Sequence, residues 1–359
     1  MWLEQPIFRE DMEYISSVDF IPWEKLRNKT ILVTGATGLI GFNLVSALAY
    51  VALYKNMPLH ILALVRDKKK STERFCELLK EKAPLSFIIG DLEHIPSIKV
   101  PVDYIIHGGS PTASRYFSEH PVETIRCNLT GTIYLLELAQ EKKTQGFVYL
   151  SSMEVYGSLH RQEKVDEAHE AFIDTMSVRN SYPEAKRMAE ALCAGYAEEY
   201  GVPAKSIRLT QTFGVGIRPN ENRVFAQFAR SALCGKDIIL LTEGRTSYSY
   251  LYTADAVTAI LTVLLNGNYG EAYNAANEAS YCSIREMAEL VAEMGSMRRP
   301  GRGAINVRVE MAEEAKKLYP AERYMDLDTR KIKKLGWHAK YTLEEMFSRM
   351  MEVHCGDCC

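Results

Sequence analysis

The sequence lacks any marked excess of charge of one sign. Its 359 residues carry 43 lysines and arginines against 46 aspartates and glutamates, which gives a formal net charge of −3, and its pI is near 6.3. A chain without a basic surplus offers no electrostatic reason to bind nucleic acid or an anionic membrane surface. We therefore expect no nucleic-acid partner and no membrane partner, and any anionic ligand must be held by a local site.

Long apolar runs and a targeting segment are also missing. The longest apolar stretch, around residues 44–53, is far shorter than the ~20 residues that span a bilayer. The first six residues have neither the basic start nor the apolar run of a secretory signal. These absences predict a soluble, cytoplasmic protein.

Cysteine is too scattered for a disulfide framework. Three of the eight cysteines lie in the tail His354-Cys355-Gly356-Asp357-Cys358-Cys359, which has no second ligand pair at zinc-site spacing. We predict no metal site and interpret residues 351–359 as a frayed tail. The other five stand singly, and we expect them to be small core residues in a reducing compartment: Cys76, Cys127, Cys193, Cys234 and Cys282.

Short apolar runs alternate with helical segments through much of the chain. Continuous apolar strands separated by helices indicate a parallel sheet covered on both faces. After residue 210 the alternation breaks down, which favours a smaller lobe over the carboxyl ends of the strands. The expected strands are 30–34, 60–65, 85–89, 102–107, 146–150 and 204–209, and the expected helices are 41–54, 121–142 and 183–200.

A glycine-rich loop with the spacing G-x-x-G-x-x-G joins the first strand to the first helix. Its glycines allow a tight turn, a close approach of the backbone to a pyrophosphate, and close packing of helix on strand. The helix amino terminus then offers free N–H groups and the positive end of its dipole to the phosphates. Strand, loop and helix occur in the order that favours dinucleotide binding over a merely structural turn. The predicted cofactor-binding residues here are Gly35, Thr37, Gly38, Leu39, Ile40 and Gly41.

The end of the second strand bears on the choice between NAD and NADP. Arg66 and Asp67 follow this strand, and three lysines, residues 68–70, come next. An acidic residue here accepts a hydrogen bond from the ribose 2′-hydroxyl of NAD, whereas an arginine favours the 2′-phosphate of NADP. Arg66 comes first, which favours NADP. The alternative interpretation of these basic residues is a solvated loop. The predicted cofactor is therefore NAD or NADP.

Only one of the twenty tyrosines has a lysine four residues later. Tyr182 and Lys186 would project from one face of a helix, where an ammonium stabilises a phenolate and lowers the tyrosine pKa from about 10. Lowering that pKa by two or three units, at about 1.4 kcal/mol each, would give a usable base near neutral pH. Ser152, at the end of the fifth strand, can bind the substrate oxygen that gains or loses the proton.

Together these motifs resemble the extended short-chain dehydrogenase/reductases, in the group of NAD-dependent nucleotide-sugar epimerases and dehydratases. The resemblance runs from about residue 30 to residue 347, and its nearest likeness is to the UDP-glucuronate decarboxylases. It is carried by HGGSPTAS (residues 107–114), SMEVYG (152–157), YPEAKRMAE (182–190) and RVFAQF (223–228).

The resemblance implies a role for each matching residue. Ser152 would hold the substrate hydroxyl, Tyr182 would be the base, Lys186 would activate it and bind the ribose, and Glu154 would lie near the reacting carbons. Asp91 and Leu92 would lie near the adenine, and Asn128 would stand in the helix behind the site. The residues assigned to the substrate are Ser110, Gln211, Arg223, Val224 and Tyr248.

Several substrate-side positions depart from the family pattern. Met153 stands where the 4,6-dehydratases have an aspartate and the decarboxylases a small hydroxyl residue. Tyr248 stands where an arginine usually binds the diphosphate or the substrate, and a tyrosine cannot replace a bidentate phosphate contact. Arg245 is an alternative source of that charge. Gln211 replaces an asparagine.

The predicted fold class is α/β, a doubly wound parallel Rossmann sheet with a smaller, interleaved C-terminal substrate lobe. We expect an N-terminal extension over residues 1–29 and a dinucleotide-binding domain with the catalytic helix over 30–209, regaining a segment near 245–275. Residues 210–244 and 276–350 would form the substrate lobe. The two long helices, 121–142 and 183–200, correspond to the pair that forms a four-helix dimer interface in this family, so the resemblance implies a homodimer.

Three functional hypotheses follow. The first is an enzyme that modifies a nucleoside-diphosphate sugar, as an epimerase or a UDP-glucuronate-decarboxylase-like enzyme, through a transient 4-keto sugar and a bound nicotinamide cofactor. The second is an NADPH-dependent carbonyl or keto-sugar reductase, for which Arg66 is the motivating residue. The third, from another class, is a non-catalytic dinucleotide-sensing module.

Overall fold

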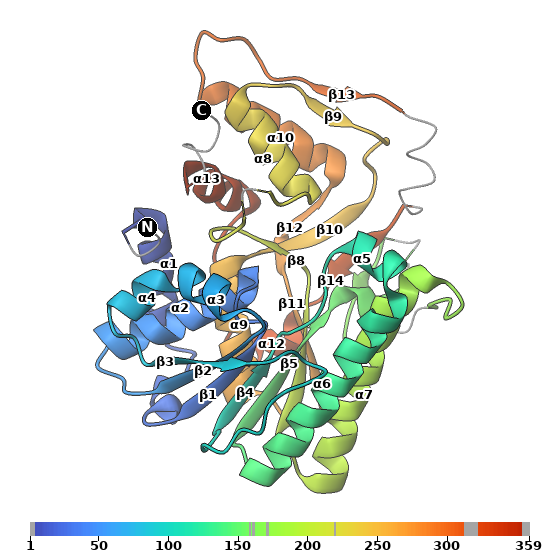
Figure 1. The fold of residues 1–359 in the computed structure, drawn as a ribbon. Helices are drawn as coiled ribbons and strands as arrows, with labels where there is room; N and C mark the ends of the chain where they lie inside the picture. Colours follow the sequence, from blue (N-terminus) through green and yellow to red (C-terminus); the bar gives the residue numbers. More distant parts are fainter. Residues whose placement is uncertain are drawn as a thin grey trace.

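A seven-stranded parallel sheet forms the centre of the computed structural model, which describes residues 4–157, 159, 162–169, 172–218, 220–311 and 322–353. The strand order is β11-β7-β5-β4-β1-β2-β3 (Figure 1). This order confirms the doubly wound parallel sheet that the sequence predicts. The strands are β1 (Thr30–Thr34), β2 (His60–Val65), β3 (Leu85–Ile89), β4 (Tyr104–His107), β5 (Gly146–Ser152), β7 (Ala204–Leu209) and β11 (Ala272–Ala275).

Helices cover both faces of this sheet. On one face α2 (Leu39–Tyr54) packs against α9 (Thr253–Asn266), and α1 (Pro6–Ser17) packs on both. On the other face α6 (Pro121–Lys142) and α7 (Ser181–Tyr200) lie side by side (Figure 1). Nearly all of α2 is buried, which its almost continuous apolar sequence allows because the sheet and two helices surround it.

Shorter helices follow the strands at the sheet edges. They are α3 (Lys68–Arg74), α4 (Cys76–Lys80) and α5 (Ser114–Glu119). The three lysines after Asp67 belong to α3, whose amino terminus is capped by the Asp67 carboxylate accepting from Lys70 N at 3.0 Å. Of the alternative of a solvated basic loop, the loop was wrong for residues 68–70, because a capping aspartate favours a helix there, but the three lysines are exposed to solvent as that alternative expects.

A second, mixed sheet lies over the carboxyl ends of the central strands. Its order is β12-β10-β14-β6, with β8 also paired to β10, and a separate parallel pair joins β9 to β13. Residues 245–275 contribute β10 to this sheet, and α9 and β11 to the central layers. The strands are β6 (Lys164–Val165), β8 (Gln211–Phe213), β9 (Ile238–Leu240), β10 (Ser247–Tyr252), β12 (Asn277–Ser283), β13 (Val307–Val309) and β14 (Tyr324–Leu327).

The remaining helices complete this upper layer or connect it to the sheet. In Figure 1, α8, α10 and α13 lie together beyond the second sheet. Their bounds are α8 (Val224–Cys234), α10 (Ile284–Met297), α12 (Arg330–Lys333) and α13 (Leu343–Val353), and the short 3₁₀ turns are η1 (Trp23–Leu26), η2 (Met153–Tyr156) and η3 (Val178–Asn180).

The amino-terminal helix α1 docks through two buried carboxyl groups. Asp11 accepts hydrogen bonds from the Tyr252 hydroxyl and from Arg349 Nη2 on α13, each at 2.8 Å. Asp255, at the start of α9, accepts from the Tyr14 hydroxyl at 3.0 Å and from two backbone N–H groups ahead of α13 at 3.0 and 3.1 Å. Burial raises the pKa of Asp11 and of Asp255 from 3.8 to about 6. The segment before residue 30 is thus part of the packed structure.

The cysteine prediction holds only in part. Cys193 is buried, but Cys76 on α4 and Cys234 at the end of α8 are exposed, so the expectation of five core cysteines was wrong for these two. Each lies at a helix end, where the residue faces solvent. The prediction of a frayed tail over residues 351–359 was wrong for 351–353, which end helix α13 and include the buried Met351; residues 354–359 lie outside the described residues. Across the described ranges, no group of three or more metal-ligating side chains is found, and no helix there is long and apolar enough to cross a membrane.

Candidate active site

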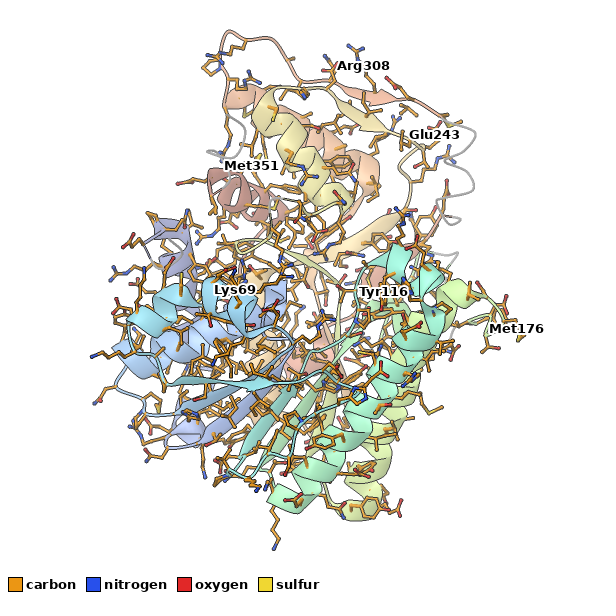
Figure 2. All side chains as sticks on the ribbon, viewed as in Figure 1. Lys69, Tyr116, Met176, Glu243, Arg308 and Met351 are labelled. Carbon is orange, nitrogen blue, oxygen red and sulfur yellow. The ribbon has the colours of Figure 1, made fainter. Side chains whose placement is uncertain are left out.

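The carboxyl ends of β1, β4 and β5 meet at one edge of the central sheet. β1 and β4 are neighbours there, although the chain passes from β1 to β2 on the other side of β1. Ligands of open α/β sheets bind where the strand order reverses in this way. Figure 2 labels Lys69 on α3 and Tyr116 on α5, which follow β2 and β4 at this edge.

The glycine loop closes against the loop that follows β4. Gly35 has a φ of 70°, and a Cβ on it would lie 2.5 Å from Gly108 O. A Cβ on Gly41 would collide with Gly35 O. Only glycine fits at these two positions, since backbone packs directly on backbone.

The amino terminus of α2 faces this edge of the sheet. Gly38 is its N-cap and carries no side chain that could accept from the first turn, so the N–H groups of that turn, including those of Leu39 and Ile40, have no intrahelical acceptor. A Cβ at Gly38 would contact only Gly35 O, at 3.2 Å. Such a helix end, with free donors and open space before it, fits a pyrophosphate.

A buried row of side chains fixes β1 to β4 behind the loop. The Thr34 hydroxyl bonds His107 Nδ1 at 2.8 Å and accepts from Gly109 N at 3.0 Å, and His107 Nε2 bonds the Thr132 hydroxyl at 3.0 Å. Burial lowers the pKa of His107 to about 3, so the ring is neutral. The row holds the Gly108-Gly109 turn, and with it Ser110, whose hydroxyl donates to Pro111 O at 3.0 Å.

The residues predicted to lie near the adenosine stand at the ends of β2 and β3. Arg66 is exposed. Asp91 accepts from the backbone of Glu93 at 2.9 Å and of His94 at 2.8 Å; burial raises the pKa of Asp91, but these bonds outweigh it and the net shift is downward. Leu92 packs against Gly109 in the loop after β4 and against Gly131 on α6. A Cβ on either glycine would lie within 3 Å of the Leu92 side chain.

The four predicted catalytic residues lie at the end of β5 and the start of α7. The Tyr182 phenol is hydrogen-bonded with the Ser152 side chain, and its ring stacks on Phe117 of α5 with centroids 4.3 Å apart and planes 3° from parallel. The Lys186 ammonium lies 5.6 Å from the centre of the Tyr182 ring and donates to Leu150 O at 2.7 Å. The helical i, i+4 spacing therefore places tyrosine and lysine on one face, beside the serine.

The expected lowering of the tyrosine pKa was wrong. Burial raises the pKa of Tyr182 and the negative charge of Glu154 raises it further, against opposing effects of Ser152, Arg179 and Arg223. Burial also lowers the pKa of Lys186 to about 7. Desolvation disfavours the charged form of both groups, so the protein alone holds Tyr182 as a neutral phenol.

Arg179 is a site residue that sequence reasoning missed. It lies on η3, one turn before Tyr182, and its Nη2 is 3.3 Å from both carboxylate oxygens of Glu154 on η2. Its guanidinium also lies 5.4 Å from the centre of the Phe117 ring. An arginine three residues ahead of the tyrosine was the available signal, because helical geometry places i and i+3 on one side. The pair puts a partly buried carboxylate and a cation beside the phenol.

The positions that depart from the family pattern adjoin one another. Met153 is buried, its sulfur accepts from the Thr210 hydroxyl at 3.3 Å, and it belongs to an apolar cluster that Tyr248 and Met325 share. Gln211 begins β8, which pairs with β10 two residues beyond Tyr248. Apolar and aromatic side chains therefore pack together at two positions where the family pattern has a hydroxyl residue and an arginine.

The remaining substrate candidates stand at the start of α8. Arg223 is its N-cap, pairs with Glu221 at 2.9 Å and lowers the pKa of Tyr182 through its charge. Val224 is the first residue of this helix. Arg223 thus lies within electrostatic reach of Tyr182.

Comparison with known proteins gives one family match. The model of the NAD dependent epimerase/dehydratase family matches residues 31–276. UDP-glucuronic acid decarboxylase 1 of Danio rerio is 27% identical over 327 residues, covering 90% of this chain and 72% of that protein. UDP-glucuronic acid decarboxylase 6 of Arabidopsis thaliana is 28% identical over 327 residues, covering 90% and 88%.

Solved structures share the fold. A UDP-glucose 4-epimerase from Thermotoga maritima with UDP-glucose matches with a TM-score of 0.74 at 21% identity, covering 91% of this chain and 99% of that one. A UDP-glucuronic acid 4-epimerase from Bacillus cereus in complex with NAD matches with a TM-score of 0.70 at 19% identity, covering 92% and 100%.

Proposed function

The chain belongs to the NAD dependent epimerase/dehydratase family, and from that premise we propose that it converts a nucleoside-diphosphate sugar through a transient ketone at C4. The observation that carries the proposal is the group of Ser152, Tyr182 and Lys186 next to an open helix amino terminus that fits a pyrophosphate. Of the two cofactors that the sequence leaves open, the family's NAD is the one proposed.

In the proposed reaction, Tyr182, Ser152 and Lys186 each bind, hold or move a proton at the 4-hydroxyl of the sugar. NAD, held at the amino terminus of α2, would supply the hydride acceptor and donor for C4 and a positive charge beside the site. The Tyr182 phenolate oxygen takes the proton of the 4-hydroxyl, and the Ser152 hydroxyl holds that oxygen in place. Lys186 supplies positive charge behind the phenolate when protonated, and its bond to Leu150 O fixes its position. Positioning and a preorganised electrostatic environment supply most of the rate.

UDP-glucuronate is the first substrate we propose. A ketone at C4 makes the C6 carboxylate the acid group of a β-keto acid, so carbon dioxide leaves and C5 takes up a proton. Glu154 lies beside Tyr182 and pairs with Arg179, and it is the candidate residue for delivering this proton to C5. The similarity to the UDP-glucuronic acid decarboxylases of Danio rerio and Arabidopsis thaliana supports this choice.

Epimerisation at C4 is the second candidate. Epimerisation needs only Ser152, Tyr182 and Lys186 with the cofactor. Its substrate is a nucleotide sugar either with or without a carboxylate at C6. Met153 and Tyr248 stand where the family pattern has a hydroxyl residue and an arginine, and this favours epimerisation. The two replacements alter the substrate side of the site and leave the base, Tyr182, in place.

The test is mass spectrometry of UDP-glucuronate incubated with the NAD-loaded protein. A product lighter by one carbon dioxide supports decarboxylation, and an unchanged mass with a new retention time supports epimerisation. If neither change occurs with UDP-glucuronate, UDP-glucose or the corresponding dTDP sugars, the proposed function is wrong.

We also propose a cytoplasmic homodimer. The outward faces of α6 and α7 carry exposed apolar side chains, namely Val122, Ile125, Ile133, Met188 and Tyr200, and two adjacent helices of this kind suit a four-helix interface with a second copy. The free cysteines of the described residues suit a reducing compartment.

A further inference from the structure

A cavity opens at the amino ends of the central strands, on the edge of the sheet opposite the glycine loop. Its volume is about 650 Å³, which is in the range of small-molecule sites. The walls come from η1, from residues at or shortly before the starts of β1, β4, β5, β7 and β11, and from the end of α9. The cavity is therefore separate from the candidate active site. Its charged and aromatic lining residues are Glu24, Lys25, Lys29, Tyr104, Lys205 and Tyr269.

Lys205, near the start of β7, is a buried cation in the wall of this cavity. Of the two lysines buried within the described residues, Lys186 belongs to the candidate active site and Lys205 does not; Lys205 is 2% exposed. Its Nζ donates to Leu264 O at 2.8 Å and lies 4.9 Å from the centre of the Tyr269 ring. An ammonium group has three N–H donors, so the carbonyl of Leu264 satisfies only part of its capacity.

The end of α9 brings a second ammonium group to the same place. The last carbonyls of a helix have no intrahelical donor and carry the negative end of its dipole. Lys25 Nζ, from η1, donates to Leu265 O at 2.8 Å, next to the carbonyl that Lys205 uses. Burial, and then the like charge of Lys25, lower the pKa of Lys205 to about 8. Two cations that repel each other are thus held at one helix end.

The carboxylates near the cavity are paired with other cations. Glu24 lies 2.7 Å from Arg27, and Asp103 lies 3.2 Å from Lys29. Lys205 forms no ion pair with any carboxylate of the described residues, and the repulsive charge of Lys25 is the one that acts on it. The cavity therefore keeps a surplus of positive charge from the two lysines at the end of α9.

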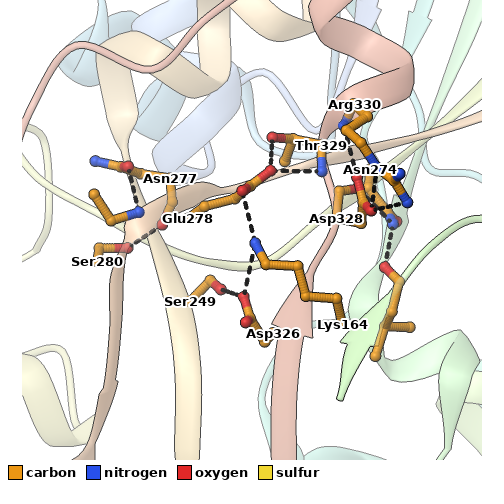
Figure 3. Close-up of polar contacts among 12 residues, drawn as sticks. Lys164, Ser249, Asn274, Asn277, Glu278, Ser280, Asp326, Asp328, Thr329 and Arg330 are labelled. Atoms are coloured by element: carbon orange, nitrogen blue, oxygen red, sulfur yellow. Dashed lines mark hydrogen bonds and ion pairs between the residues drawn. The ribbon is translucent and has the colours of Figure 1, made fainter.

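Enclosed charges in the second sheet have the opposite arrangement (Figure 3). There the carboxylate of Glu278 lies 2.7 Å from Lys164, and the carboxylate of Asp328 lies 2.6 Å from Arg330. Each of these carboxylates has a cation beside it, as buried charges in proteins generally do. The ammonium of Lys205 lacks such a counter-ion from the described chain, although an open cavity lies next to it.

We propose that this cavity binds a small molecule that carries a phosphate or carboxylate group, held between the ammonium groups of Lys25 and Lys205. An oxyanion accepts from the donors that the end of α9 leaves unused, and its charge offsets the repulsion between the two lysines. The ring of Tyr269 is 60% exposed at the cavity wall and offers a face to a ring attached to the anion. Binding here uses no atom of the candidate active site, so the proposal does not rest on the proposed function.

Titration calorimetry of the purified protein, with NAD present to fill the cofactor site, tests the proposal. Inorganic phosphate, citrate and adenosine monophosphate are titrated at constant ionic strength into the unmodified protein and into Lys205→Met. Lys80→Met, on the exposed end of α4, is the matched control. We expect Lys205→Met to weaken binding of the preferred probe about 10- to 100-fold, and Lys80→Met to bind it normally. Because Lys205→Met breaks no ion pair, its melting temperature should not fall.

The pH dependence of sulfate binding gives a second readout. Sulfate keeps its charge between pH 7 and 9, whereas Lys205 loses its proton at a pKa of about 8. The affinity of the unmodified protein for sulfate should therefore fall about 10-fold over this range, and that of Lys205→Met should not change in this way. The charged and titratable groups around Lys205 are Glu24 and Lys25 from η1, Lys29 with its partner Asp103, Tyr104 from β4 and Tyr269 ahead of β11.

The outcomes identify the ligand class or overturn the site. Tighter binding of phosphate than of citrate identifies a phosphate ligand, and the reverse identifies a carboxylate. Tighter binding of adenosine monophosphate than of phosphate, lost in Tyr269→Ala, identifies a ligand with a ring. Equal binding by folded Lys205→Met and the unmodified protein, or binding of none of the probes, would overturn the proposal. None of these measurements requires turnover of a nucleotide sugar, so a failure of the proposed function is recognised separately.

Discussion

The buried carboxyl groups beneath α1 give the stability of this protein an unusual dependence on pH. Asp11 and Asp255 each have a pKa raised from 3.8 to about 6, chiefly by burial. A group whose pKa is higher in the folded state binds its proton more tightly there. Its contribution to stability is therefore complete below pH 4 and is lost as the pH rises through about 6.

The size of the effect follows from the two pKa values. The difference between 3.8 and about 6, at about 1.4 kcal/mol per unit, corresponds to about 3 kcal/mol for Asp255. The change Asp255→Asn removes this titration and keeps the shape. Its amide oxygen can accept from the two backbone N–H groups that now bond Oδ2, and its NH₂ can donate to the Tyr14 hydroxyl, which now donates to Oδ1.

Melting temperatures between pH 4.5 and 7.5 provide the assay. About 2 kcal/mol of this is lost between pH 4.5 and 7.5, so at about 2 °C per kcal/mol for a large chain the difference between Asp255→Asn and the unmodified protein should grow in favour of the variant by about 4 °C over that range. Asp19→Asn supplies the control, because the Asp19 side chain is exposed and makes no part of the buried contacts beneath α1. A constant offset for Asp255→Asn as well would refute the argument that a buried, destabilised carboxylate is present at neutral pH.

Four further changes test the site and the assembly. Tyr182→Phe should retain NAD while turnover of UDP-glucuronate, followed by mass spectrometry, falls about 10²- to 10⁴-fold. Glu154→Gln removes a charge that raises the Tyr182 pKa, so the rising limb of any residual pH–rate profile should move to lower pH; an unmoved limb would mean that Tyr182 is not the titrating base. Gly41→Ala should lose bound NAD, measured by absorbance after desalting, because its Cβ would collide with Gly35 O. Light scattering should give twice 40.6 kDa, and Ile133→Glu on α6 should halve that mass, whereas Tyr54→Glu, at the exposed end of α2 on the opposite face of the sheet, should not.

The central sheet and the glycine loop could be predicted because their signals are local. Each buried parallel strand is a continuous apolar run. Gly41 is required by its contact with Gly35 in the same strand–loop–helix unit, whereas Gly35 itself packs against the distant Gly108-Gly109 turn. Tyr182 and Lys186 were found for the same reason, since one turn of helix places them together.

The pKa of Tyr182 could not be predicted from the sequence. The spacing shows that an ammonium is near, but not that Phe117 covers the ring or that burial lowers the pKa of Lys186 itself. Desolvation depends on how many distant segments surround a group. Both effects work against the lowering of the Tyr182 pKa that a neighbouring lysine would otherwise cause.

The pairing of β14 with β10 could not be predicted, because a strand this short has no periodicity that reveals its register. The docking of Asp11 on Tyr252 and Arg349 could not be predicted either, because these partners are distant in sequence. The sequence predicted an N-terminal extension over residues 1–29, but not the buried acid that docks it.

The interleaving of the second sheet with the central one has a consequence for how substrate preference can change. β6, β8, β10, β12 and β14 enter that sheet from five separate stretches of chain, with α9 and β11 between two of them. No single cut excises a substrate-recognising module, so exchanging whole segments between relatives would break pairings on both sides of the cut. Divergence within such an architecture must proceed by individual replacements inside a fixed frame. Met153 and Tyr248, which share one apolar cluster, are the kind of coupled pair that this route produces.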